Sequence, residues 1–132
     1  MSGRRLLKTL FVVTCKPGKE LRAAEEVMDL LLYCDEGALA VPTAKGLALG
    51  TTSLGPEEAA KCLEGKVSAY INWIYFGDEL CEKCKALKKQ CLEEVEEGFE
   101  AFCTGRAIVK IKKALRAKRG VLVSVPLRRN ER

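Results

Sequence analysis

The first part of the chain alternates between two hydrophobic periods, and this alternation limits the folds that it can adopt. Leu10 to Thr14 form a β-branched and aromatic run that ends at a Pro-Gly turn, which predicts a buried strand. From Lys19 to Tyr33, apolar residues recur every three or four positions, which predicts a helix with one apolar face. We therefore expect a strand followed by an amphipathic helix.

A similar pattern follows in the next segment. Gly37 to Val41 and Gly46 to Thr51 are short strand candidates separated by a turn. A second helix is expected from Gly55 to Leu63, because Pro56 stands at its first position and acids fill its first turn. Ala69 to Phe76 is rich in Ile and aromatic residues and predicts a strand. The order βαββαβ predicts a ferredoxin-like sandwich.

The remaining residues predict a helix and then a hairpin. Asp78 to Phe102 carries apolar residues at spacings of three and four, as in a long helix. Arg106 to Lys113 alternates basic and apolar residues and is followed, after a turn, by Val121 to Val125. The expected fold is α+β, a ferredoxin-like βαββαβ sandwich followed by a long helix and a basic β-hairpin. A boundary near Gly77 divides residues 1–77 from 78–132, and we expect both to pack as one compact unit.

Positive charge gathers in the last 29 residues, Thr104 to Arg132, which hold ten Lys or Arg and one acid. That segment has a net charge of +9, whereas the preceding 103 residues have a net charge of −4. Such asymmetry is typical of polyanion binders, with a lysine-rich solvated edge as the alternative interpretation. The chain has no aromatic residue after Phe102, although single-strand readers usually stack bases on aromatic rings.

These features favour recognition of folded RNA through its phosphates. The candidate RNA-binding residues share a positive charge and a place in the tail: Arg106, Lys110, Lys112, Lys113, Arg116, Lys118, Arg119, Arg128 and Arg129. Earlier aromatic residues, Tyr70, Trp73 and Tyr75, lie in a predicted strand, where we expect them to pack in the core.

A smaller anion site is a candidate at the start of the first helix, because helix N-termini present free N–H groups. Its residues are Lys16, Gly18 and Lys19, and an ordinary turn is the alternative. The sequence contains no His, which excludes Ser-His and Cys-His nucleophiles and His-ligated metals. We expect no catalytic residue, cofactor or metal.

Seven cysteines are many for a chain of 132 residues. Cys81 and Cys84 form a Cys-x-x-Cys at the predicted start of the long helix, where metal binding, redox chemistry and simple packing all remain open. Few amide residues beside many Lys and Glu suggest a hyperthermophile, in which intracellular disulfides occur. The candidate disulfide cysteines are Cys15, Cys34, Cys62, Cys81, Cys84, Cys91 and Cys103.

Three segments together resemble a known family. Phe11 to Glu20, with the helix that follows it, resembles the opening of THUMP-containing RNA-modification proteins. Gly46 to Leu49 and Pro56 to Leu63 are similar to the second half of that N-terminal domain. Arg106 to Lys113 looks like the first strand of the THUMP domain proper, of which only a part is expected here.

The resemblance is strongest to the small THUMP proteins that assist tRNA cytidine acetylation. It implies binding of structured RNA, typically tRNA near its acceptor end, with the chemistry done by a partner enzyme. We therefore expect a non-catalytic RNA-binding adaptor for tRNA modification, in the cytoplasm and without a membrane segment. Two alternatives remain, a protein–protein module that assembles through a sheet edge and a thiol enzyme built on Cys81 and Cys84.

Overall fold

The computed structural model describes residues 9–81, 91–94, 100–103 and 108–126, with side chains over 9–78 and 109–126. Within these ranges the chain is an α+β protein with eight strands and two helices. The helices are α1 (Glu20–Leu31) and α2 (Pro56–Leu63). The strands are β1 (Thr9–Cys15), β2 (Leu39–Ala44), β3 (Leu47–Thr52), β4 (Ile71–Cys81), β5 (Cys91–Glu94), β6 (Glu100–Cys103), β7 (Ile108–Lys118) and β8 (Val121–Val125).

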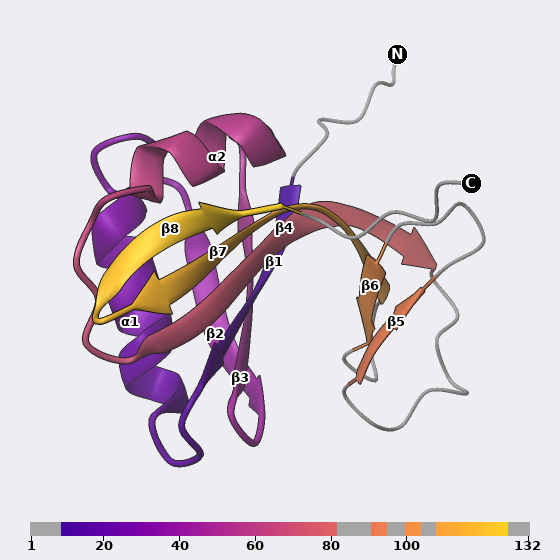
Figure 1. Cartoon of the computed structure of the whole chain (residues 1–132), viewed down its shortest axis with the longest axis horizontal. Coiled ribbons are helices and arrows are strands. Elements are labelled where there is room, and N and C mark those ends of the chain that lie inside the picture. The colour runs from indigo at the N-terminus through magenta and orange to yellow at the C-terminus, as the bar shows by residue number, and fades with distance from the viewer. Residues whose placement is uncertain (1–8, 82–90, 95–99, 104–107, 127–132) are drawn as a thin grey trace.

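All described strands belong to one antiparallel sheet. Its order is β2-β3-β1-β4-β7-β6-β5, and β8 pairs with the last part of β7. Figure 1 shows both helices on one face of the β2-β3-β1-β4 part, while β5 and β6 lie at the far end of a strongly curved sheet. The predicted order of strand, helix, strand, strand, helix and strand is confirmed over β1 to β4.

The long helix predicted from Asp78 to Phe102 is wrong wherever the structure describes that range. β4 continues to Cys81, and β5 and β6 are strands. The cause is pairing, since Asp78 lies opposite Lys110 on β7 and Cys81 lies opposite Ile108. A ladder to a neighbouring strand overrides helical periodicity, which is only a weak local preference. Residues 82–90 and 95–99 of the predicted helix lie outside the described ranges.

β4 crosses the predicted boundary near Gly77 without a break. Its register with β7 shifts between Phe76 and Gly77. A Cβ atom at Gly77 would lie 1.8 Å from the carbonyl oxygen of Lys110, so only glycine permits this close approach. The division into residues 1–77 and 78–132 stays a prediction, and at this point both parts share one sheet.

The two faces of the sheet carry different cores. The helix-covered face, on which α1 and α2 pack, holds the larger cluster, in which Phe11 and Phe76 from the sheet meet Leu31 and Leu63 from the helices. Residues that alternate with these point to the open face, where a smaller cluster includes Val12 but no helix residue. Neither described helix is long and apolar enough to span a bilayer.

Two carboxylates tie loops to the helix-covered face. Glu26 on α1 accepts hydrogen bonds from the Ser68 hydroxyl and from the Ala69 and Tyr70 N–H groups, at 3.0, 2.7 and 2.9 Å. It thereby joins α1 to the segment that leads into β4. Asp35 accepts from the Thr52 hydroxyl at 2.6 Å and from backbone N–H groups, and these bonds hold the pKa of its carboxyl below the usual value.

Candidate nucleic-acid interface

The predicted basic hairpin exists, and it is longer than the sequence suggested. β7 runs to Lys118 and pairs with β8 from Lys118↔Val121 to Ala114↔Val125. Arg119 and Gly120 form the turn with φ angles of 55° and 82°. Two successive residues with positive φ match the twist of a tight hairpin, and glycine adopts the second angle without strain. The hairpin therefore holds its charges on an ordered frame.

A bulge divides β7 into two parts. Phe76 lies opposite Lys113 and Gly77 opposite Ile111, so Lys112 is an extra residue on β7. Before the bulge, Val109 and Ile111 are buried in the open-face cluster, as the sequence alternation predicted. After it, Leu115 is buried in the helix-side cluster. Lys110 precedes the bulge, Lys112 forms it and Lys113 directly follows it. We call these three the proximal cations, and Arg116, Lys118 and Arg119 the distal cations.

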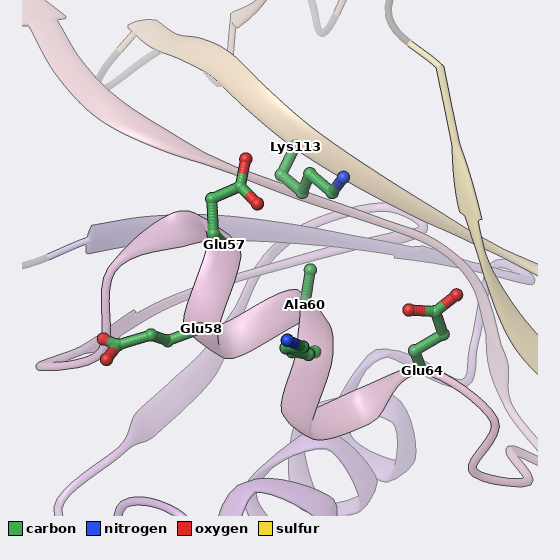
Figure 2. A pocket seen from close by; sticks show the side chains of 6 residues that line it. Glu57, Glu58, Ala60, Glu64 and Lys113 are labelled. Carbon is green, nitrogen blue, oxygen red and sulfur yellow. The ribbon is translucent and has the colours of Figure 1, made fainter.

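The proximal cations lie close to acids. The Lys112 ammonium is 2.8 Å from the Asp78 carboxylate. Lys113 borders a hollow of about 320 Å³ that is also lined by Glu57 and Glu64 from α2. Figure 2 shows the Lys113 side chain extending above α2, between these two glutamates. Acids this close would repel an approaching phosphate, so this part of the hairpin is a poor binding surface.

The distal cations are exposed at the other end of β7. Arg116 pairs directly with Trp73 on β4, and its guanidinium carbon lies 5.4 Å from the centroid of the Trp73 ring. Among the described residues, the ion pair on this hairpin joins Lys112 to Asp78 and involves none of the distal cations. The distal end therefore combines exposed positive charge with an aromatic ring.

Trp73 packs against the open-face cluster, as the sequence predicted for the aromatic residues of this strand, but it is not fully buried. Tyr75 is buried as expected, and Tyr70 packs half-buried against the helix-side core. Trp73 is only half-buried, and it stacks on Tyr75 with ring centroids 5.4 Å apart and an interplanar angle of 5°. The alternation of β4 puts Trp73 and Tyr75 on the open face. The pairing of Trp73 with Arg116, however, depends on the register between β4 and β7.

Exposed lysines outside the tail lie at the same end of the sheet. Thr14 on β1 pairs with both Trp73 and Leu47, and Lys16 and Lys45 follow these strand ends and are exposed. The sequence interpretation did not include Lys45, because nothing local joins that turn to the tail. Three other predicted RNA-binding residues, Arg106, Arg128 and Arg129, lie outside the described ranges.

The candidate anion site at Lys16, Gly18 and Lys19 already has internal acceptors. The Gly18 N–H donates to the Glu20 carboxylate at 3.0 Å, and the Lys19 N–H donates to the Lys16 carbonyl at 3.0 Å. The same Glu20 oxygen accepts from the Gly46 N–H at 2.6 Å. The bonds from Gly46 and Gly18 lower the pKa of Glu20, so a carboxylate occupies the place where an anion would bind.

The cysteines divide into several groups. Cys34, just after α1, and Cys62, on α2, form a disulfide, which confirms that prediction for this pair. Cys15 is free and buried, so its candidacy was wrong; it faces the helix-side core, and burial raises the pKa of its thiol. Cys91 and Cys103 lie directly opposite each other on β5 and β6.

Contrary to the sequence prediction, the Cys-x-x-Cys motif does not begin at a helix start. Cys81 ends strand β4, whereas the sequence placed it at a helix start that would lower a thiol pKa. Its partner in the motif, Cys84, lies outside the described ranges. Among the described residues, no group of three or more Cys, Asp or Glu side chains is placed to hold a metal ion.

Comparison with known proteins does not place the chain in a family. No protein-family model and no curated protein sequence matches it. The resemblance to THUMP-containing proteins therefore stays a prediction that rests on the residues quoted for it.

Proposed function

We propose that this protein binds structured RNA, with tRNA as its ligand, and serves as a non-catalytic adaptor for an RNA-modifying enzyme. The observation that carries the proposal is the group of exposed distal cations, Arg116, Lys118 and Arg119, beside the partly buried Trp73. Lys and Arg bind phosphates as point charges or forks, and an ordered hairpin keeps them in fixed positions. The choice of tRNA and of an enzyme partner comes from the THUMP resemblance.

The fold that we propose for β1 to β4 with α1 and α2 is ferredoxin-like. Its support is the antiparallel order β2-β3-β1-β4 with both helices on one face. Alternating βαβ units connected in this way produce such a sandwich. β5 to β8 then extend the sheet beyond β4. Val12 and Tyr75 are buried on the face without helices, so the surface that we propose for RNA is the end of that face at Trp73 and Arg116.

We place the protein in the cytoplasm of a hyperthermophile. The Cys34–Cys62 disulfide is compatible with that setting, because intracellular proteins of such organisms carry disulfides. A composition rich in Lys and Glu and poor in Asn and Gln agrees with it.

A gel-shift experiment with total tRNA at low and high salt tests the proposal. Binding through phosphates releases counterions, so the affinity should fall steeply as salt rises. A variant in which Lys110, Lys112, Arg116, Lys118 and Arg119 are replaced by Gln should bind all tRNA sequences more weakly. Unchanged binding by that variant would remove the proposal.

The β2 edge favours a second candidate function, assembly with another protein. Leu39 and Val41 on this edge strand are 62% and 57% exposed, and β2 carries no charged residue. Beside them lies a hollow of about 280 Å³ that Leu10 and Leu49 also line. An uncharged apolar edge is an available pairing site for another strand. In this second function, the basic hairpin would bind an acidic region of the partner protein. A salt-sensitive complex with tRNA, and none with acidic proteins, would decide against this second function.

A further inference from the structure

We infer that Trp73 and Arg116 form a stacking site for an unpaired RNA base on the open face of the sheet. The inference rests on the proposed RNA binding. It adds single-stranded RNA segments to the ligands, beside the phosphate backbone of folded RNA.

The geometry supplies three flat groups in sequence. Tyr75 is buried and stacks nearly parallel on Trp73, which fixes the orientation of the indole ring. Trp73 is partly buried against the open-face cluster, and the exposed Arg116 lies across the strand pair with its guanidinium over that ring. With Tyr75 stacked on the indole ring and the Arg116 guanidinium over it, the three groups form one rigid platform on the surface.

The chemistry of such a platform suits a nucleobase. RNA bases outside a duplex stack on aromatic rings and on arginine guanidinium planes, whereas bases inside a duplex are already stacked on each other. Arginine beside an aromatic ring also strengthens the stack through cation–π attraction. A paired segment of tRNA offers no free base face, so this site selects loops, bulges or ends.

Charge near the platform suits the phosphate that accompanies the base. Lys118 lies two residues beyond Arg116 on the same strand, so both point to the same face, and Lys118 is exposed. The neighbours of Trp73 and Arg116 in the same row of the sheet are Thr14, Leu47 and Val123, none of which is charged. Within this row of described residues, a nucleotide would contact cations and neutral side chains.

Trp73 is also the reporter for the test, because the chain has one tryptophan. A mixed-sequence single-stranded RNA of about ten nucleotides and the duplex made from it should be titrated into the full chain. We expect the single strand to quench the Trp73 emission saturably, with the same midpoint as the anisotropy of a labelled strand. The duplex should raise the anisotropy without comparable quenching.

Two substitutions make the test specific. Trp73→Leu should weaken single-strand binding about ten-fold or more and leave duplex binding nearly unchanged, whereas Trp73→Phe should retain much of the affinity. Single-strand binding without a change in emission would overturn the inference, as would full affinity of Trp73→Leu, and both would leave the proposed RNA binding intact. If neither RNA binds, the proposed function fails with it. The quenching of the unchanged protein decides the matter even if Trp73→Leu does not fold.

Discussion

The two faces of this sheet serve different ends. On the helix-covered face, a disulfide links the segment after α1 to α2, and the Glu26 hydrogen bonds and the larger core hold the helices against the strands. On the open face, the cluster is smaller and its distal end leaves Trp73 and three cations accessible. If the proposed RNA binding holds, stability and recognition rest on separate residues. Substitutions on one face should therefore leave the property of the other unchanged.

β7 shows the same division within one strand. Its proximal cations lie beside Asp78 and the glutamates of α2, and its distal cations lie beside Trp73. A run of basic residues that looks uniform in the sequence thus has a proximal part beside acids and a distal part that is exposed.

The largest expected effect is on the helix-covered face. Replacing Cys34 and Cys62 together by Ser removes a link across 28 residues of sequence. The loop-entropy account predicts a loss of about 3–4 kcal/mol in the free energy of unfolding, which lowers the melting temperature on the order of 10 °C. The affinity for tRNA at 25 °C should not change. Reductant should lower the melting temperature of the unchanged protein in the same way, and a double variant as stable as the parent would contradict the prediction.

A smaller effect is expected from Glu26→Ala. Three donors, on Ser68, Ala69 and Tyr70, lose a charged acceptor, which should lower the free energy of unfolding by about 2 kcal/mol. Denaturant unfolding measures this change, and Glu25→Ala is the matched control because Glu25 is an exposed acid of the same helix. Equal effects of the two variants would mean that the bonds of Glu26 contribute nothing specific.

The smallest effect, and the sharpest division, is expected in RNA binding. Replacing Arg116, Lys118 and Arg119 by Gln should weaken tRNA binding about ten-fold and lower the slope of log affinity against log salt by about 2. Replacing Lys110, Lys112 and Lys113 by Gln removes the same charge and should have much less effect. Filter binding at several salt concentrations measures both. Equal losses would show that net charge matters and that the proximal and distal cations do not form separate surfaces.

The sequence predicted the first part of the fold because local and tertiary preferences agree there. The run before Lys16 is apolar enough for a central strand, and Pro56 with its acids marks the start of α2. The prediction failed after Phe76 because pairing with neighbouring strands overrides the helical spacing of the apolar residues there. Local periodicity cannot tell which neighbour a segment will find.

The candidate site was predictable only where local sequence patterns define it. The basic residues of the hairpin and their ordered frame follow from alternation and from the Gly120 turn. The pairing of Arg116 with Trp73 does not, because 43 positions of sequence separate residues that only the β4–β7 register brings together. Likewise, Cys34 and Cys62 were two candidates among seven until α1 and α2 packed side by side.

By itself, the sequence determined the order of the first strands and helices, the amphipathic faces of both helices and the concentration of positive charge near the end of the chain. These are local quantities, set by the residues within each segment. The tertiary structure decided which cations lie beside acids, which aromatic ring is partly accessible and which cysteines form a disulfide. These depend on strand register and on the packing of helices against the sheet, which bring together residues far apart in the chain.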